Sequence, residues 1–284
     1  MAIALERTIP IPVPPSTPFE RFRWAILDSL VVARRNLSHI RHIPEKLSDV
    51  TVQPILFVVL FGYVFGSAIA IPGGNYREFL MAGMFAMTLF GTINSTAVGM
   101  SDDMSKGLVD RFRALPMARS AVLIGRTLSD MLEACLGVTL LALTGLAVGW
   151  RAHEGVGHTV AAFALVLLFG FAMSCAGMFV GLTVRSPESA QSLGFVVFFP
   201  LIFLSNNFVP TDNMPAVLRQ IADWSPISAV TAALRDLFGN PGAPTADSPW
   251  PLQHAAIISI AWSLAFVAVF LPLGVRKYLR ATAR

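Results

Sequence analysis

Six long stretches without Asp, Glu, Lys or Arg constrain the fold of this chain more than any other feature of its sequence. A helix needs about 20 mostly apolar residues to cross a bilayer, and most of these stretches reach that length. They run from 50 to 71, 79 to 100, 134 to 150, 159 to 184, 189 to 211 and 248 to 275. Because 55% of the residues are hydrophobic and only 13% are charged, a soluble globular fold is excluded. The sequence therefore predicts an all-α polytopic membrane protein with six transmembrane helices.

The third span begins ahead of its uncharged stretch, because its helical pattern starts near Ala121. This start puts Arg126, Asp130 and Glu133 on one face of its first turns, where opposite charges neutralise each other. Two interpretations of these residues stay open: a structural ion pair near the headgroups, or a relay of motion from the preceding loop. We place the six spans at about 50–71, 79–100, 121–150, 159–184, 189–209 and 252–275.

The basic residues indicate which side of the membrane the chain ends face. The number of spans is even, so both termini lie on one side. Of the 21 Lys and Arg residues, 17 fall in the terminal segments and connections on that side. Since cytoplasmic loops carry an excess of basic residues, we predict that both termini are cytoplasmic. This bias, together with anionic lipid as a partner, explains the net charge of +4 without any nucleic acid.

The segments outside the spans carry their own signals. Residues 1–18 are rich in proline and are predicted to form a disordered cytoplasmic tail. Residues 276–284 are predicted to be a basic cytoplasmic tail. Between the first tail and the first span, 19–43 has the pattern of an amphipathic helix in the membrane interface. The long connection before the last span holds two helix signals, at 213–224 and 225–238. Both are too short and too charged to span, so we expect outer helices of the re-entrant type.

A short basic segment lies between the second and third spans, and it predicts a helix over 103–116. Its apolar and charged positions fall on separate faces: Met104, Leu108, Phe112 and Leu115 on one, and Lys106, Asp110 and Arg113 on the other. Pro116 ends the pattern. A cytoplasmic helix with two faces is either a simple linker or a docking site for another protein.

The sequence argues against a catalytic activity in this chain. No lysine occurs in the G-x-x-x-x-G-K-[ST] pattern that binds nucleotide phosphates, so any ATP and Mg²⁺ would be bound by another protein. No cofactor motif, metal-binding spacing of histidines or cysteines, or catalytic set is present. An ion- or proton-driven secondary carrier and a membrane enzyme or scaffold stay open as alternatives, although no carboxylate pair lies at mid-membrane.

Aromatic side chains in the first, second and fifth spans could line a path for a hydrophobic substrate, and Pro200 should kink the fifth span. Ordinary packing or lipid contact is the competing interpretation. The candidates are Phe57, Phe61, Phe65, Phe90, Asn94, Phe195, Phe198, Phe199 and Phe203.

Two segments resemble the permease subunits of ABC-2 type ABC transporters, in the daunorubicin/doxorubicin-resistance-like branch that exports drugs and amphipathic lipids. One is Met104 to Arg126 (MSKGLVDRFRALPMARSAVLIGR), and the other is Ser205 to Arg235 (SNNFVPTDNMPAVLRQIADWSPISAVTAALR). The resemblance implies a six-helix transmembrane domain over 50–275 in a bacterial plasma membrane. It implies export of a hydrophobic substrate such as a drug, antibiotic, polyketide or lipid.

The resemblance also implies two kinds of protein partner. Two copies of a cytoplasmic ATPase subunit would bind ATP, and a second permease chain would complete a homodimer or heterodimer. The segment from Lys106 would be the coupling helix that docks on the ATPase, through Lys106, Gly107, Leu108, Asp110, Arg111, Phe112, Arg113, Leu115 and Pro116. Many relatives have an acidic residue where this chain has Lys106, which changes the charge that the ATPase must complement.

Overall fold

The computed structural model describes residues 44–64, 66, 69, 71, 74–107, 121–211 and 214–281. Several predictions fall outside these residues and stay predictions. They concern the tail 1–18, the interfacial helix 19–43, the part of the helix 103–116 that follows Gly107, and Phe65.

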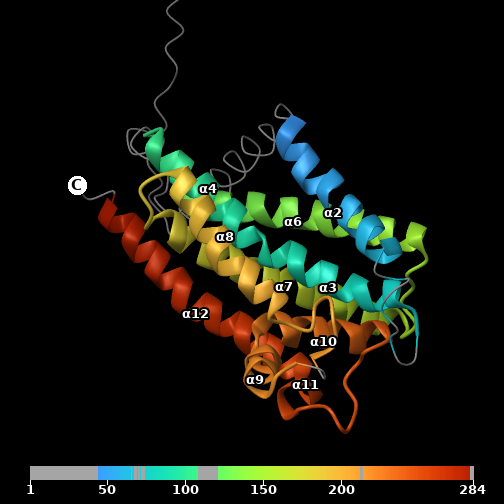
Figure 1. Ribbon diagram of the computed structural model, residues 1–284. Helices are drawn as coiled ribbons and strands as arrows, with labels where there is room; N and C mark the ends of the chain where they lie inside the picture. Colours follow the sequence, from blue (N-terminus) through green and yellow to red (C-terminus); the bar gives the residue numbers. More distant parts are fainter. Residues whose placement is uncertain are drawn as a thin grey trace, which may run out of the picture.

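The described residues form helices and no β-strand, and most of the long helices lie side by side (Figure 1). The helices are α2 (Pro44–Val64), α3 (Tyr76–Phe90), α4 (Thr92–Ser105), α6 (Ala121–Val148), α7 (Val156–Gly181), α8 (Pro187–Phe203), α9 (Ala216–Trp224), α10 (Pro226–Phe238), α11 (Trp250–Gln253) and α12 (Ala255–Ala281).

Among the described residues, four helices are long and apolar enough to cross a membrane. They are Tyr76–Ser105, Gly125–Val148, Val156–Gly181 and Ala255–Arg280, and Val52–Val64 and Pro187–Phe203 are shorter apolar helices. The prediction of an all-α polytopic membrane protein is therefore confirmed. The prediction of six crossings requires two more spans than these four helices, and it stays a prediction.

α3 and α4 together form the first of these long helices, with Gly91 at their junction. Gly91 has helical backbone angles (φ −61°, ψ −20°), so the chain continues in nearly the same direction. Thr92 Oγ1 donates a hydrogen bond to the carbonyl of Leu89 at 2.6 Å, which satisfies a backbone acceptor at this junction. Eleven of the fifteen residues of α3 are buried, so this helix lies at the centre of the core.

α7 packs closely against α4 because glycines face that helix. A Cβ at Gly177 would collide with the backbone carbonyl of Ile93, and a Cβ at Gly181 would collide with that of Ala97. Small residues spaced four apart allow two membrane helices to approach at backbone distance. This contact fixes α4, which contributes residues to the sites described below.

α4 ends differently from the prediction, which started a new helix at residue 103. The helix runs on to Ser105, and Lys106 follows as its C-terminal cap. Gly107 then adopts a left-handed conformation (φ +62°), which commonly terminates a helix and which glycine adopts without strain. Lys106 and Gly107 therefore belong to the end of α4.

α8 ends at Phe203, before residue 209, where we placed the end of the fifth span. The following residues, Ser205 to Phe208, are buried although their backbone is irregular. Such backbone is tolerated at depth only where protein supplies hydrogen-bond partners. The backbone N–H of Asn206 donates to Ser228 Oγ of α10 at 3.0 Å. α10 therefore supplies a hydrogen-bond partner that the backbone would find within α8 if that helix were longer.

α10 is almost entirely buried and has strong local signals at both ends. Ser225 caps its first turn by accepting a hydrogen bond from the backbone N–H of Ile227, and Pro226 occupies its first position. Gly239 ends the helix in a left-handed conformation (φ +65°). α9 begins at Ala216, later than the predicted residue 213, because Pro215 before it is extended.

Candidate functional site

The two ends of the bundle carry different groups. α4 ends beside the C-terminal part of α12, where Tyr278 packs in one cluster with Met100 and Leu182. Helices α9, α10 and α11 gather at the opposite end (Figure 1). We call these the Lys106 end and the α10 end.

Arg126 on α6 lies between two carboxylates near the Lys106 end. Its Nε is 3.1 Å from Oδ1 of Asp130, one turn further along α6, and its Nη1 is 3.6 Å from Oδ2 of Asp103 on α4. The guanidinium fits against α4 because Gly99 has no side chain, and a Cβ there would collide with it. Arg126 therefore joins α6 to the end of α4.

Asp130 also binds side chains inside the bundle through its other oxygen. Thr96 Oγ1 of α4 donates a hydrogen bond to Oδ2 at 2.8 Å, and Ser174 Oγ of α7 donates to the same oxygen at 3.0 Å. Asp130, Thr96 and Ser174 are all buried. A buried charge is tolerated only when it is paired and hydrogen-bonded, and these contacts supply both conditions across three helices. We call Thr96, Asp103, Arg126, Asp130 and Ser174 the charged cluster.

The charged cluster differs in membership from the predicted set. The structure brings Arg126 and Asp130 together, and Glu133 lies half-buried further along α6, where its charge also acts on Arg126. Sequence reasoning missed Asp103, Thr96 and Ser174. The available signal was weak: hydroxyl side chains within apolar spans tend to hydrogen-bond across helices, but spacing does not name their partners. A role of the cluster in relaying motion stays a prediction.

Lys106 forms an exposed ion pair at the end of α4. Its Nζ is 2.7 Å from Oδ2 of Asp102, and the Lys106 side chain is 63% exposed. Because Asp102 and Asp103 are adjacent, one carboxylate pairs with Lys106 and the other with Arg126, whose side chain is 15% exposed. The remaining predicted coupling residues lie outside the part of the chain that the structure describes: Leu108, Asp110, Arg111, Phe112, Arg113, Leu115 and Pro116.

Six phenylalanine rings form a continuous series from α2 to α8, which we call the aromatic row. Phe208, in the segment after α8, is the link that sequence reasoning missed: its ring centre is 4.9 Å from that of Phe61 and 5.6 Å from that of Phe203. Each neighbouring pair is in ring contact, in the order Phe57, Phe61, Phe208, Phe203, Phe199 and Phe195.

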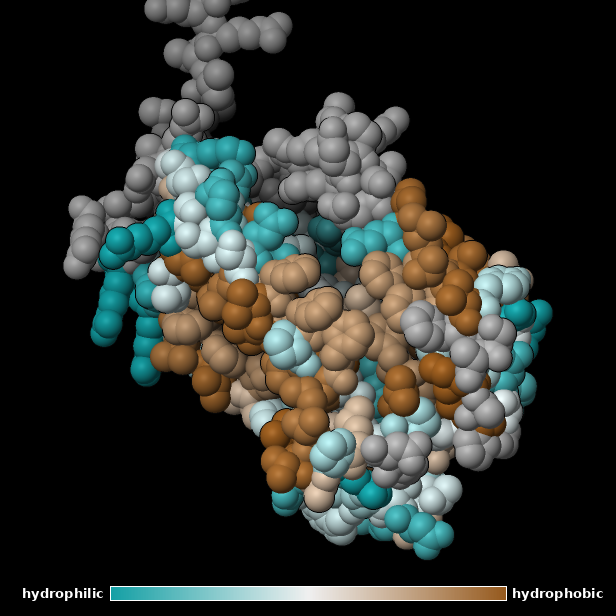
Figure 2. Space-filling model, in the orientation of Figure 1, coloured by the Kyte–Doolittle hydropathy of each residue, from teal (hydrophilic) through white to brown (hydrophobic). Residues whose placement is uncertain are grey.

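The aromatic row lies partly on the outside of the bundle. Phe195 is 69% exposed, and Phe199 and Phe203 are each 51% exposed. Figure 2 shows hydrophobic side chains across the face that α2 and α8 form. α2 also carries further exposed apolar residues, among them Leu56, Leu60 and Val64. A row of rings on an apolar face can contact lipid, another protein chain or a hydrophobic substrate.

The other predicted path residues lie deeper, between α3–α4 and α8. The ring of Phe198 meets that of Phe90 edge to face, with centres 5.1 Å apart. Asn94 and Phe198 both line a pocket of about 160 Å³ between α4 and α8. The structure therefore divides the candidate residues into a row that is exposed along α8 and a group that is half-buried or buried beneath it.

Arg235 on α10 is buried to 1% exposure, although it lies in the predicted outer helix 225–238 and is not among the 17 basic residues counted on the cytoplasmic side. Its Nε donates a hydrogen bond to the carbonyl of Phe79 at 3.2 Å, and its Nη2 donates to the carbonyls of Asn206 and Asn207 at 2.9 and 3.3 Å. Arg235 therefore satisfies the irregular backbone after α8. A signal existed in the sequence, because the residues just before this arginine are mostly apolar or small (ISAVTAAL).

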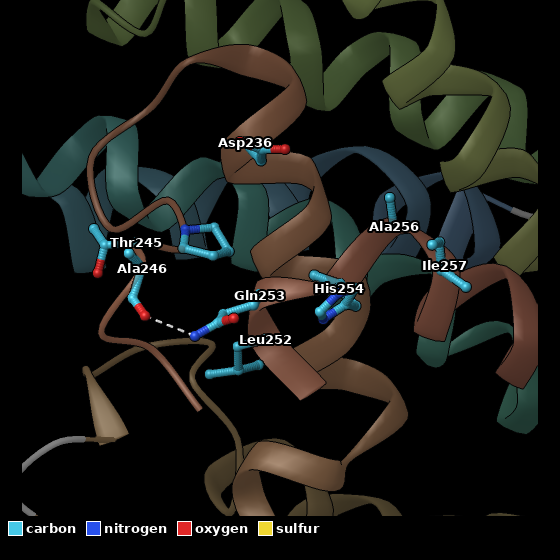
Figure 3. Close-up of a pocket in the computed structure, with 10 residues that line it drawn as sticks. Asp236, Thr245, Ala246, Leu252, Gln253, His254, Ala256 and Ile257 are labelled. Atoms are coloured by element: carbon cyan, nitrogen blue, oxygen red, sulfur yellow. Dashed lines mark hydrogen bonds between the residues drawn. The ribbon is translucent and has the colours of Figure 1, made fainter. Parts of the chain in front are cut away.

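A second pocket, of about 370 Å³, opens at the α10 end (Figure 3). Gln253 donates hydrogen bonds to the carbonyls of Ala246 and Ser248, both at 2.7 Å, and so holds the loop that forms one wall. Asp236 and His254 contribute its ionisable groups. Within the described residues, no group of three His, Cys, Asp or Glu side chains is placed to hold a metal ion.

An all-helical multi-pass bundle with a buried charged cluster and an apolar, aromatic outer face is typical of a membrane permease domain. The family model described as ABC-2 type transporter matches residues 29–238, which is more than half of the chain. The chain therefore belongs to the ABC-2 type transporter family, as the two sequence segments predicted. It is a multi-pass membrane permease, as expected for a protein of the bacterial plasma membrane.

Curated relatives cover most of the chain. The daunorubicin resistance ABC transporter permease protein DrrB1 of Streptomyces coeruleorubidus is 31% identical over 255 residues, which is 89% of this chain and 87% of that protein. The doxorubicin resistance ABC transporter permease protein DrrB of Mycobacterium tuberculosis is 25% identical over 76% of each chain. The putative transport permease ycf38 of Cyanophora paradoxa is 24% identical over 86% of this chain and 85% of its own length.

Proposed function

We propose that this chain is the permease subunit of an ATP-driven exporter that moves hydrophobic or amphipathic molecules out of the cell. The aromatic row carries this proposal, because rings exposed on one apolar face suit a substrate with an aromatic or greasy body. Two of the relatives are named for resistance to daunorubicin and doxorubicin, which supports a drug, an antibiotic or a polyketide as cargo. A lipid is the remaining class of cargo.

The proposed topology has six crossings and cytoplasmic termini. The Lys106 end would be cytoplasmic, because Arg185 follows α7 on that side and Arg276 and Lys277 lie near the C-terminal end of α12. α2 and α8 would be the two further spans besides the four long apolar helices. The α10 end would then face the outside, with α10 embedded in the outer half of the bundle.

Energy would come from a separate ATPase subunit, present in two copies, that binds ATP and Mg²⁺. The proposed docking element begins at Lys106 and continues to Pro116. Adjacent carboxylates support a route inward from it: Asp102 pairs with Lys106, and Asp103 pairs with Arg126 of the charged cluster. Movement of the docking element would thereby reach α6 and α7.

A second permease chain would cover the face that carries the aromatic row, to make either a homodimer or a heterodimer. The exposed apolar side chains of α2 and α8 support this arrangement, since two such faces could enclose a path between them. Switching the direction of access requires the substrate to bind the two states with different affinity.

The proposed function is tested in vesicles that contain the permease with its ATPase. We expect efflux of daunorubicin that requires ATP, and we expect Phe199→Ala to reduce it. As a control, Ile260→Ala removes an exposed apolar side chain of α12, outside the aromatic row. Efflux driven by a proton gradient without ATP would overturn the proposal in favour of a secondary carrier, and no efflux of any aromatic drug or lipid would overturn export.

A further inference from the structure

The pocket of about 370 Å³ at the α10 end has the volume of a small-molecule site, for which the range is roughly 300–1,000 Å³. The last turn of α10 contributes Asp236, the loop before α11 contributes residues 244–246, and residues 252–257 contribute the rest. Figure 3 shows the loop on one side of the pocket, the start of α12 on the other side, and Asp236 between them. Among the described residues that line this pocket, none is a lysine or an arginine.

Two polar side chains in the pocket have already used their hydrogen-bond donors. Gln253 Nε2 donates to the carbonyls of Ala246 and Ser248, both at 2.7 Å, so the side-chain oxygen of Gln253 remains as an acceptor. His254 Nδ1 lies 3.1 Å from the carbonyl of Trp250. A carbonyl only accepts, so Nδ1 carries the proton, and the neutral imidazole keeps Nε2 as an acceptor.

The third polar side chain is the carboxylate of Asp236, which is exposed. Within the described part of the chain, no side chain forms an ion pair or a hydrogen bond with it. Asp236 lies in the last turn of α10, where the negative end of the helix dipole also favours a cation. The pocket therefore offers three acceptors, one of them charged. A primary ammonium group, with one positive charge and three N–H donors, is complementary to this set.

An apolar stripe leads away from the pocket along α12. Ile257 lines the pocket and is 66% exposed. Ile260 and Leu264 follow at helical spacing on the same face, and both are exposed. α12 is one of the helices that are long and apolar enough to cross a membrane. An alkyl chain that lies on this stripe stays in the bilayer while its head group enters the pocket.

We infer that the pocket binds the primary ammonium head group of an amphiphile whose apolar chain lies along α12. Either of two sources presents this chemistry: a membrane lipid with an ammonium head group, such as phosphatidylethanolamine, or a free long-chain amine. The inference goes beyond export, because such binding requires neither ATP nor an ATPase subunit.

The test is native mass spectrometry of the full chain in a neutral detergent, with probes that share one alkyl chain: dodecylamine, dodecyltrimethylammonium and dodecanol. The trimethylated probe should bind about 3- to 10-fold more weakly than dodecylamine, because it keeps the charge but has no N–H to donate. Asp236→Asn should raise the Kd of dodecylamine about 3- to 5-fold, the effect of losing one exposed ion pair. The Kd of dodecanol should change less than about 2-fold.

Asp247→Asn is the matched control, because it removes the same charge from an exposed residue of the neighbouring loop that does not line the pocket. It should change the binding of no probe. Ala246→Phe places a large side chain in the pocket from an exposed loop position, so it should weaken dodecylamine while the melting temperature stays unchanged.

The proposed site is overturned by equal effects of Asp236→Asn and Asp247→Asn, by equal binding of dodecylamine and its trimethylated analogue, or by unchanged binding in Ala246→Phe. Lysophosphatidylethanolamine carries the same ammonium group beside a phosphate, and it distinguishes the two sources. If it displaces dodecylamine, the occupant is a membrane lipid. If it does not, the occupant is a free amine, and both results support an ammonium site.

Discussion

The guanidinium carbon of Arg235 lies 3.5 Å from the centre of the Phe79 ring, so a buried cation of α10 stacks on an aromatic residue of α3. The same guanidinium donates to backbone carbonyls on α3 and on the segment after α8. A cation that satisfies three carbonyls in an apolar interior stabilises the position of each segment that it contacts.

Arg235→Ala should strongly destabilise the protein, because it removes the hydrogen bonds to three buried carbonyls and opens a cavity. We expect a cost of about 3–5 kcal/mol in the free energy of unfolding. The matched control is Arg219→Ala on α9, where a partly exposed arginine faces Asp223 at 3.8 Å and the cost should be below about 1 kcal/mol. Thermal unfolding in detergent compares the two. Similar melting temperatures would contradict a structural role for Arg235.

Arg126 and Asp130 should show energetic coupling. Arg126→Gln removes one partner of a buried pair and should cost about 3–5 kcal/mol. Adding Asp130→Asn should recover part of this loss, because the remaining carboxylate is then no longer charged. A double-mutant cycle on unfolding measures the coupling, which we expect to be about 1–3 kcal/mol. Additive effects of the two changes would show that the ion pair contributes nothing.

Gly177→Ala should separate α4 from α7, since the new methyl group collides with the carbonyl of Ile93. The expected loss is about 1–3 kcal/mol, the range for overpacking a close contact. Gly157, in the first turn of the same helix, has open space around it, so Gly157→Ala should be neutral or slightly stabilising. If both variants melt at the same temperature, the glycine contact does not matter.

Lys106→Glu should affect assembly rather than folding. The ion pair with Asp102 is exposed, so its loss should change the unfolding free energy by less than about 1 kcal/mol. If Lys106 docks on the ATPase, charge reversal there, or at Arg113, should abolish co-purification of the two subunits. Lys277→Glu, on the end of α12, is the control. Normal co-purification of Lys106→Glu would move the docking face elsewhere.

The exposed rings of the aromatic row should matter little for folding. Phe199→Ala should lower the unfolding free energy far less than Phe85→Ala, because Phe85 is fully buried and its truncation should cost about 3–5 kcal/mol. Efflux should show the opposite order among folded variants. Thermal melting and daunorubicin efflux, measured on the same preparations, make the comparison. A large folding defect in Phe199→Ala would make the row part of the core.

Much of the fold follows from local sequence signals. Uncharged stretches predicted the long helices, and the Ser225-Pro226 start and Gly239 end predicted α10 closely. The end of α8 was not predictable from charge, because the uncharged stretch continues past Phe203 to residue 211. The chain leaves the helix there because α10, distant in sequence, supplies Ser228 and Arg235 as partners for its backbone.

The candidate sites were predictable to a smaller degree. Spacing placed Arg126 and Asp130 on one face of α6, because residues four apart on a helix are neighbours. Spacing within one helix says nothing about Thr96 and Ser174, which reach Asp130 from two other helices. Phe208 was missed for a related reason: it lies outside any helix and meets Phe61 only after the chain folds back.

The hydrogen bonds of Arg235 have a mechanical consequence for any transport cycle. They fasten α3, α10 and the segment after α8 into a single rigid body, whose parts separate only if a buried cation loses its partners. We therefore expect an opening at the α10 end to occur along the surface of this body, between neighbouring subunits, while its interior stays closed.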